Sequence, residues 1–196
     1  AARLAHEPAV DGIEINLSCP NLGGKRIPAE DVRTAARYVR AAKLASGRKP
    51  VFAKLSPNVT DICRVALACE TAGADGLVLV NTVKAVAVDI ARGRIIAGGY
   101  SGPGIKPIGL RAVCEVYRHV RIPIVGCGGI ASGRDALEYI LCGARCVAVG
   151  SAGFARPDLA GEIVFFLRSY LRGRRRSLAD LVGSLHGESS HGTRRE

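Results

Sequence analysis

The 196-residue sequence lacks methionine and tryptophan altogether, and aromatic residues make up only 5% of it. So few aromatic rings leave little material for stacking on nucleic-acid bases. No uncharged apolar run reaches the ~18 residues expected of a membrane-spanning helix, and no signal-peptide pattern opens the chain, so we expect no membrane partner. Because even an initiator methionine is missing, we expect the protein's own beginning to lie elsewhere.

The seven cysteines show neither metal-binding nor disulfide spacing. No pair has the C-x₂-C spacing of a zinc or iron–sulfur site, so we expect no metal. Most lie within apolar periodic segments, unlike those of a small disulfide scaffold, and this pattern favours the reducing, cytoplasmic compartment. Six are expected to pack as small apolar side chains: Cys63, Cys69, Cys114, Cys127, Cys142 and Cys146.

Positive charge is in excess, with 28 Lys and Arg against 17 Asp and Glu and a formal net charge of +11. Such an excess can indicate nucleic acids or acidic substrates. The basic residues are spread along the chain, however, and the densest run, 172–176, falls at the end of an expected helix. We therefore interpret this run as a solvated surface rather than a nucleic-acid patch, and we expect no nucleic-acid partner.

Short apolar runs alternate with longer helical patterns along the chain. Strands are predicted at 13–17, 50–55, 76–81, 123–126 and 146–150, and helices at about 29–46, 59–72, 108–119, 133–141 and 157–172. A long connection is expected over 82–107. Near-continuous Val, Ile and Leu strands separated by helices predict a parallel sheet with covered faces, built from five βα units.

Polar residues at the strand ends distinguish between the possible α/β folds. No GxGxxG motif follows the first strand, which argues against a dinucleotide-binding unit. Ser, Gly, Asn and Lys cluster instead at the carboxyl end of every strand, over 16–21, 54–58, 81–82, 126–129 and 150–151. In a (β/α)₈ TIM barrel such ends converge on one pocket. We therefore predict an incomplete barrel with five of the eight βα units.

Glycine-rich turns follow the last two predicted strands, over 126–129 and 150–153. Glycine lets backbone N–H groups approach a phosphate closely, and Ser151 adds a hydroxyl donor. Barrels often hold phosphate at their last two strands. The pattern predicts a phosphate-bearing cofactor or substrate, with ordinary tight turns as the alternative interpretation.

Cys19 differs from the other cysteines because it follows directly on a predicted strand, between Ser18 and Pro20. A thiolate can act as a general base when a nearby cation or helix terminus lowers its pKa. Taken by itself, Cys19 fits a loop cysteine with no catalytic role equally well.

Lys54 interrupts an apolar strand at a position that should face the barrel interior. A buried lysine requires an anionic partner or a shifted pKa, although a lysine at a strand end can also extend to solvent. Asn16, Asn81 and Thr82 likewise place hydrogen-bonding groups at the ends of buried strands. Amides and a hydroxyl in this arrangement suit a flat heterocycle with alternating carbonyl and N–H edges.

Several of these segments resemble the dihydroorotate dehydrogenase family, in the family's order and at its spacing. The motifs are IEINLSCPN at 13–21, KLSPNVTDI at 54–62, NT at 81–82, SGPGIKP at 101–107, GGI at 128–130, AVG at 148–150 and DLVGSL at 180–185. The resemblance is closest to class 1, and within it to the NAD-linked class 1B catalytic subunit. It implies a partial FMN-binding barrel domain over 1–185, with strands four to eight, and composition predicts a disordered tail over 186–196.

The family oxidises dihydroorotate to orotate in pyrimidine (UMP) biosynthesis with FMN as cofactor. By position, the resemblance implies that Cys19 is the base that removes the C5 proton while hydride passes from C6 to FMN. The implied substrate contacts are Asn16, Asn21, Asn81 and Thr82. The implied FMN contacts are Asn16, Lys54, Val80, Gly102, Gly128, Gly129, Gly150 and Ser151.

The resemblance also implies partners, namely a second copy of the chain and a subunit with FAD and an iron–sulfur cluster. The family's first three strands have no counterpart here, so we interpret the sequence as the C-terminal part of a longer protein or an incomplete gene product. Two other interpretations stay open: a flavin barrel resembling tRNA-dihydrouridine synthase, and a non-catalytic remnant. Stoichiometric FMN and cooperative unfolding of the purified chain would reject the remnant.

Overall fold

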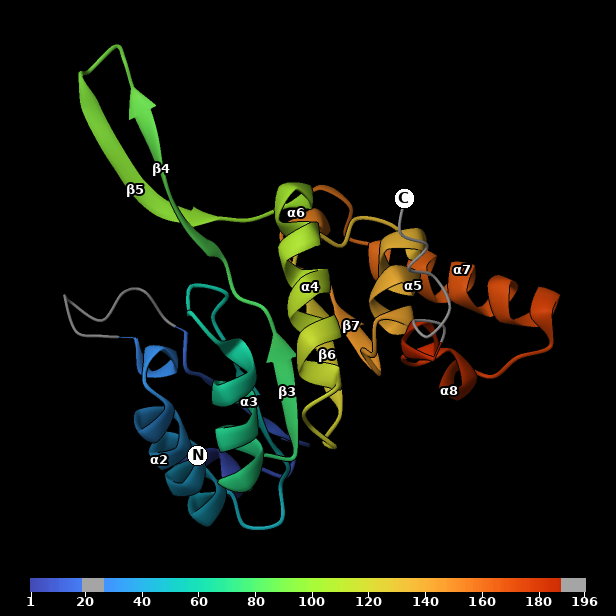
Figure 1. The fold of residues 1–196 in the computed structure, drawn as a ribbon, viewed down its shortest axis with the longest axis horizontal. Coiled ribbons are helices and arrows are strands. Elements are labelled where there is room, and N and C mark those ends of the chain that lie inside the picture. The colour runs from blue at the N-terminus through green and yellow to red at the C-terminus, as the bar shows by residue number, and fades with distance from the viewer. Residues whose placement is uncertain (19–26, 188–196) are drawn as a thin grey trace, which may run out of the picture.

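A computed structural model describes residues 1–18 and 27–187 and shows a five-stranded parallel sheet flanked by helices (Figure 1). The strand order is β1-β2-β3-β6-β7, and every neighbouring pair is parallel. The strands are β1 (Ile13–Asn16), β2 (Val51–Lys54), β3 (Gly76–Leu79), β6 (Ile124–Cys127) and β7 (Cys146–Ala148). The predicted five parallel βα units are thus confirmed.

Helices connect the strands and pack against one face of the sheet. The longer ones are α2 (Val32–Ala45), α3 (Ile62–Thr71), α4 (Lys106–Tyr117), α5 (Gly133–Leu141) and α7 (Leu159–Arg174). Shorter turns are α1 (Ala2–Ala5), η1 (Pro28–Glu30), η2 (Pro103–Ile105), α6 (Ala152–Ala155), α8 (Leu178–Leu181) and η3 (Ser184–His186). Within the described ranges, none of these helices combines the length and hydropathy that a membrane crossing requires.

Capping side chains set helix starts that periodicity alone placed less accurately. Asp31 is extended and accepts a hydrogen bond from the Thr34 amide, so the predicted helix at 29–46 divides into η1 and α2. Asp61 caps α3 in the same way, which delays its start beyond the predicted residue 59. The predicted helix 133–141 matches α5, which Ser132 caps. A side-chain acceptor at the N-cap satisfies an otherwise unpaired helix amide, which explains these positions.

The segment predicted as a plain connection over 82–107 contains a β-hairpin instead. Strands β4 (Val83–Asp89) and β5 (Arg94–Tyr100) pair in an antiparallel two-stranded sheet that projects away from the main body (Figure 1). Gly93 has a φ of +59° in the tight turn, a conformation that favours glycine. Asn58 anchors the base of the hairpin, since its amide donates to the Thr82 carbonyl at 3.0 Å and accepts from the Lys84 amide at 2.8 Å.

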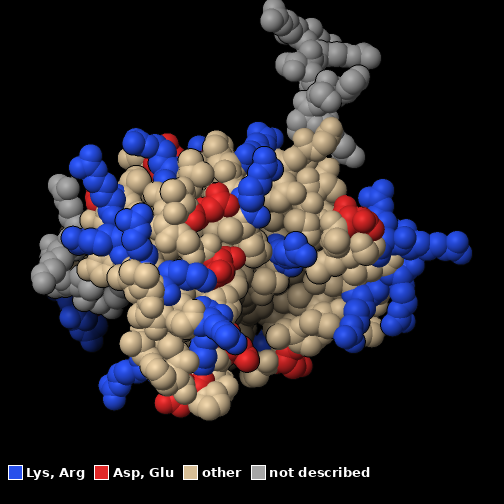
Figure 2. All heavy atoms as spheres, turned by 90° about the horizontal axis from the view of Figure 1, so that it is seen from below, with Lys and Arg blue, Asp and Glu red and all other residues tan. Residues whose placement is uncertain are grey.

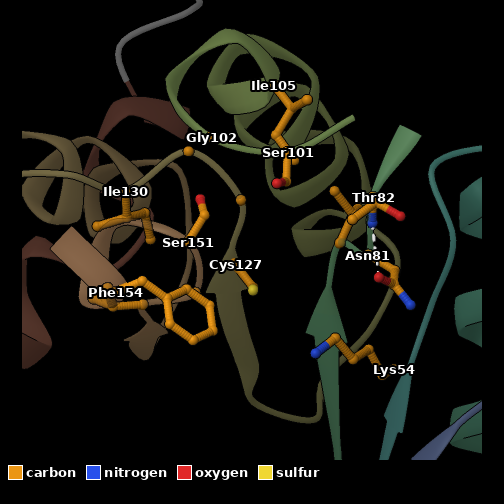
Figure 3. A pocket seen from close by; sticks show the side chains of 15 residues that line it. Lys54, Asn81, Thr82, Ser101, Gly102, Ile105, Cys127, Ile130, Ser151 and Phe154 are labelled. Atoms are coloured by element: carbon orange, nitrogen blue, oxygen red, sulfur yellow. Dashed lines mark hydrogen bonds between the residues drawn. The ribbon is translucent and has the colours of Figure 1, made fainter. Parts of the chain in front are cut away.

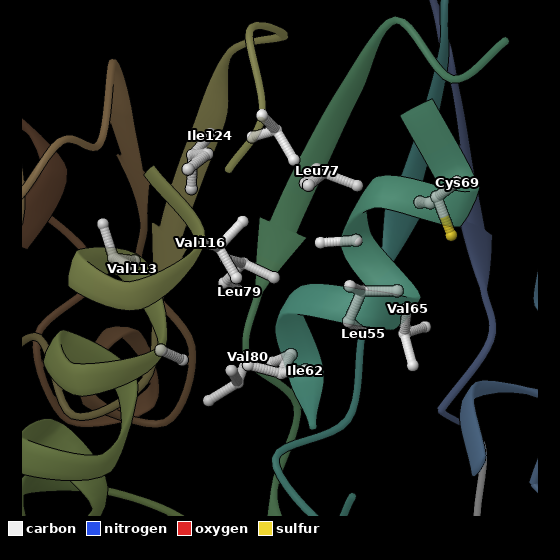
Figure 4. Packing of buried hydrophobic residues seen from close by; sticks show 14 of the residues in the cluster. Leu55, Ile62, Val65, Cys69, Leu77, Leu79, Val80, Val113, Val116 and Ile124 are labelled. Atoms are coloured by element: carbon white, nitrogen blue, oxygen red, sulfur yellow. The ribbon is translucent and has the colours of Figure 1, made fainter. Parts of the chain in front are cut away.

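The hydrophobic core lies between the sheet and the helices that cover it (Figure 4). Leu55, Leu77 and Leu79 at the sheet meet Val65 of α3 and Val116 of α4, and all five are essentially inaccessible to solvent. Strand β3 is buried at all four positions because it is the central strand. This packing fixes the carboxyl ends of β2, β3 and β6 relative to one another.

The other face of the sheet is open and carries the polar and titratable residues of the strands. Glu14, Lys54 and Cys127 lie on this inner face, and the alternating burial of β2 and β6 shows the difference between the two faces. The expectation that Cys146 packs as a small apolar side chain is wrong. Cys127 is half-buried and Cys146 is exposed, because both point toward the open face rather than toward the helices.

Charged side chains are mixed over the visible surface rather than sorted by sign. Figure 2 shows Lys and Arg spread over this face with Asp and Glu among them, and a further group of basic side chains at the end where α7 lies. Arg172 and Arg174 fall in the last turn of α7, where a cation stabilises the helix terminus. The run at 172–176 therefore has a structural explanation as a solvated helix end.

Candidate active site

A cavity of about 400 Å³ opens at the carboxyl ends of the strands (Figure 3). Most of the residues singled out in the sequence line it: Lys54, Val80, Asn81, Thr82, Gly102, Gly128, Gly129, Gly150 and Ser151. Lys54 ends β2, residues 80–82 follow β3, and the glycine turns follow β6 and β7. The parallel sheet brings these groups together because all its strands end at one edge.

The backbone after β3 is held firmly on both sides. The Val80 amide donates to the Cys127 carbonyl at 2.7 Å, and the Asn81 amide donates to the Leu55 carbonyl at 3.0 Å. These hydrogen bonds extend the ladder to the neighbouring strands beyond the end of β3. The side chains of Asn81 and Thr82 therefore start from a fixed backbone.

A hydrogen-bond network connects the ends of β1 and β3. Asn81 Nδ2 donates to Ser18 Oγ at 2.7 Å, and Ser18 Oγ donates to Asn16 Oδ1 at 2.9 Å. Asn81 Oδ1 accepts from the Thr82 amide at 2.8 Å. Among the described residues, Asn16 Oδ1 accepts hydrogen bonds from the Ser18 amide, Ser18 Oγ and Asn81 Nδ2. Asn16 does not itself line the cavity.

Ser18 is a candidate site residue that the sequence analysis did not single out. It is 3% exposed and forms the hub of this amide network, immediately before Cys19. Its position next to the strand end was the only available signal. Cys19 and Asn21, the predicted base and one predicted substrate contact, lie outside the described residues.

Lys54 directs its amino group into the space beside the cavity, as the sequence predicted (Figure 3). Its side chain is 25% exposed, and Nζ lies 3.5 Å from Glu14 Oε1. Cys127 also points into this space. Burial raises the pKa of the Cys127 thiol, the Lys54 charge lowers it and the Glu14 charge raises it. The Cys127 thiol therefore experiences both charges, from a position that the sequence analysis had assigned to packing.

The glycine loops at the cavity meet through their backbones. Gly129 has a φ of +70°, and a Cβ there would lie 2.7 Å from the Lys106 amide nitrogen and 2.9 Å from the Gly102 carbonyl oxygen. A side chain at this position has no room. At Gly150, by contrast, φ lies outside the left-handed region and a Cβ would meet nothing within 4 Å. Protein atoms leave this glycine open space, which suits close approach by a ligand.

Replacement by alanine is expected to affect folding stability at Gly129 and ligand binding at Gly150. Gly129→Ala is expected to lower the free energy of unfolding by about 1–3 kcal/mol, because the strained φ and the backbone contacts cannot relax. On the prediction that this turn holds the phosphate of FMN, Gly150→Ala is expected to leave stability unchanged and to weaken FMN binding by about tenfold, because the added Cβ would hinder backbone hydrogen bonds to the phosphate. Chemical denaturation and fluorescence titration with FMN measure the two quantities. Unchanged FMN affinity in Gly150→Ala would contradict a phosphate site here.

An ion-pair cluster between α4 and α5 contacts the loop that follows β6. Lys106 Nζ lies 2.7 Å from Asp135 Oδ1 and 2.9 Å from Glu138 Oε2. Burial raises the pKa of Asp135, but hydrogen bonds from Lys106, Ser132 and the Ala131 amide outweigh it, so its pKa is lowered overall. The carboxylate thus joins the start of α4 to the start of α5.

Acid is expected to remove the stabilisation that Asp135 provides. Because its pKa is lowered in the folded state, the contribution is complete above the unfolded pKa near 3.8 and is lost as pH falls through the lower folded value. Thermal unfolding should show Asp135→Asn less stable than the original chain at neutral pH. The difference should shrink steadily below about pH 4. A difference that stays constant down to pH 2 would contradict this assignment.

Comparisons with known proteins identify relatives of this chain. The family model described as dihydroorotate dehydrogenase matches residues 1–171. The chain is 46% identical over 195 residues to the "Dihydroorotate dehydrogenase B (NAD(+)), catalytic subunit" of Desulforudis audaxviator, and 44% identical over 193 residues to the protein of that name from Desulforamulus reducens. These matches cover 95% of this chain and 62% and 63% of the two relatives, so the chain spans less than two thirds of their length.

The fold is also found in a solved structure. The crystal structure of DHODH from Eimeria tenella in complex with ferulenol superposes with a TM-score of 0.77 at 24% sequence identity, covering 90% of this chain and 54% of the other. This likeness supports the architecture of five βα units from a (β/α)₈ barrel. The family match over 171 residues and the identity of about 45% to the relatives show that the chain belongs to the dihydroorotate dehydrogenase family.

Proposed function

We propose that this chain provides the main part of the pocket in which an FMN-dependent enzyme oxidises dihydroorotate to orotate. The observation that carries the proposal is the convergence of Lys54, Asn81 and the glycine loops on one cavity. Family membership supports the reaction, and the hydrogen-bonding groups at the strand ends support a flat heterocyclic substrate.

The residues of the cavity fit FMN. Gly150 leaves space where a Cβ would stand, Ser151 offers a hydroxyl, and the Gly128–Gly129 turn brings backbone groups to the same side of the cavity. These features suit a phosphate group. Lys54 would lie against the ring, where its cation stabilises negative charge. Val80 and Gly102 would line the ring, and bound FMN would supply the acceptor for the hydride that leaves C6 of the substrate.

Substrate binding is assigned to the amide groups at the ends of β1 and β3. Asn81 and Thr82 start from a fixed backbone, and Ser18 connects the Asn81 side chain to that of Asn16. With Asn21, they would hold the carbonyl and N–H edges of dihydroorotate. Cys19 would then take the proton from C5 as the general base. Ser18, directly before it, is buried and hydrogen-bonded, which supports a defined starting point for this segment.

The proposal on partners is based on the names of the relatives and not on surface features of the described residues. The relatives named above are called catalytic subunits of an NAD⁺-linked enzyme. We therefore propose that the whole protein passes electrons to a second subunit that carries FAD and an iron–sulfur cluster, and that it pairs with its own copy in the cytoplasm. Size-exclusion chromatography of the co-expressed proteins tests both associations.

The proposal is tested by following flavin absorbance after addition of dihydroorotate under anaerobic conditions. The samples are the chain loaded with FMN and a chimera that adds the portion of the Desulforudis audaxviator relative outside the match. Bleaching of the flavin by dihydroorotate, and not by dihydrouridine in RNA, supports the proposed substrate. A chimera that holds FMN and is not reduced by dihydroorotate contradicts it.

A further inference from the structure

An ion pair on the inner face of the sheet places a carboxylate beside the cavity lysine. Glu14 Oε1 lies 3.5 Å from Lys54 Nζ. In the parallel register Asn16 lies opposite Lys54, so Glu14 is two residues earlier on the same face of β1. Within the described ranges Glu14 is the one carboxylate at ion-pairing distance from Lys54. No role assigned above uses this carboxylate.

The two members of the pair differ in exposure, and Lys54 is the more buried of them. The Lys54 side chain is 25% exposed and that of Glu14 is 45% exposed. Charges at such a partly buried site interact more strongly than in water, although solvent still screens them. A lysine side chain also has several rotatable bonds, and a carboxylate beside its amino group restricts them.

Cys127 on β6 lines the same cavity as Lys54. Its thiol lines the cavity and feels Lys54 and Glu14 with opposite sign, in addition to burial. Tyr139 of α5 also interacts with this thiol, and its hydroxyl donates to the Gly128 carbonyl at 2.7 Å. Three strands thus place a carboxylate, an ammonium group and a thiol on the inner face of the sheet.

We propose that Glu14 is a positioning residue that holds the Lys54 ammonium at the cavity and moderates the positive charge offered to the cofactor ring. The assignment of the ring to this cavity rests on the proposed function. With Glu14 in place, the lysine has a defined location and part of its field is compensated. Without it, the cavity becomes more positive and the lysine less ordered. Negative charge on a bound ring would then be favoured more strongly.

A first experiment uses the Cys127 thiol as the reporter and requires no cofactor. The pH dependence of iodoacetamide alkylation is followed at Cys127 by peptide mass spectrometry, in the original chain and in Glu14→Gln. We expect the thiol pKa to fall by about half a pH unit, which gives roughly threefold faster alkylation below the pKa. Lys54→Gln should shift the pKa upward, and Glu115→Gln, which removes a surface carboxylate that pairs with Arg111, should leave it unchanged.

The double variant distinguishes positioning from simple addition of charges. If Glu14 acts through Lys54, the effect of Glu14→Gln on Cys127 must change when Lys54 is already glutamine. Equal effects in both backgrounds would contradict positioning. Should Glu14→Gln fail to fold, Glu14→Asp must give a smaller shift in the same direction, and an unchanged profile contradicts the proposal.

A second experiment measures the reduction potential of bound FMN in the same variants. Glu14→Gln is expected to raise the potential, and Glu14→Asp to stay closer to the original value. A potential that Glu14→Gln leaves unchanged overturns the proposal. If the protein binds no FMN, the proposed cofactor fails, whereas the alkylation profile of Cys127 still decides whether Glu14 controls Lys54. The two failures are therefore distinguishable.

Discussion

Replacement of Cys19 by alanine is expected to slow dihydroorotate-dependent flavin reduction by about 10²–10⁴-fold, the usual contribution of a general base. The C5 proton would then have no acceptor at the protein, whereas the cavity around Lys54 and Asn81 would stay intact. Binding of FMN should accordingly be unchanged. Stopped-flow absorbance under anaerobic conditions measures the rate, with the FMN-loaded protein described under the proposed function.

Cys63→Ala provides the matched control, because Cys63 lies on α3 away from the cavity residues. It should keep the original rate. Cys19→Ser should retain part of the activity at high pH, since a serine hydroxyl ionises at higher pH than a thiol and is almost entirely un-ionised near neutral pH. Full reduction rates in Cys19→Ala would reject this thiol as the base and return Cys19 to the interpretation of a loop residue.

Replacement of Tyr139 by alanine is expected to lower the free energy of unfolding by about 3–5 kcal/mol, the range for a buried aromatic side chain. Tyr139 is 0% exposed and is among the largest fully buried side chains. A Cβ at Gly126 would lie 2.4 Å from its ring, and one at Gly109 would lie 1.9 Å from its hydroxyl oxygen. The ring therefore fills the space that two glycines leave between β6, α4 and α5. Urea unfolding followed by circular dichroism measures the loss.

Tyr139→Phe separates packing from hydrogen bonding. The hydroxyl donates to the Gly128 carbonyl at 2.7 Å. The pKa of Tyr139 is raised, mainly by burial. Removal of the hydroxyl should cost about 1–2 kcal/mol and weaken FMN binding, because the Gly128–Gly129 turn loses its support from α5. Equal stability of Tyr139→Ala and Tyr139→Phe would show that the ring contributes nothing beyond the hydroxyl, contrary to the packing described above.

Much of the fold and of the candidate site could be predicted because the relevant signals are local. Apolar runs such as 51–55 mark buried parallel strands, and polar residues at their carboxyl ends identify the edge where a pocket forms. Lys54, Asn81 and Gly128 were placed at one cavity in this way, and the structure brings them together there. Their chemical roles remain proposals, and Cys19 lies outside the described residues.

The hairpin and the thiol beside Lys54 show where local signals are insufficient. Strands β4 and β5 form one ladder that joins Val83 to Tyr100, a pairing that no single window of sequence contains. Cys127 sits in an apolar run and resembles a core residue until the sheet determines which face it occupies. The sites of Ser18 and Tyr139 likewise depend on partners more than ten residues away, Asn81 and Gly128 respectively.

The sequence by itself determined the order of five βα units, the end of the sheet that carries chemistry and the family. Only the tertiary structure decided that Glu14 meets Lys54, that Ser18 joins two asparagines, and that a tyrosine supports a glycine turn. The physical reason is the range of the interactions. Hydrophobic periodicity and turn chemistry act within one element, whereas these contacts depend on strand register and helix packing across the whole sheet.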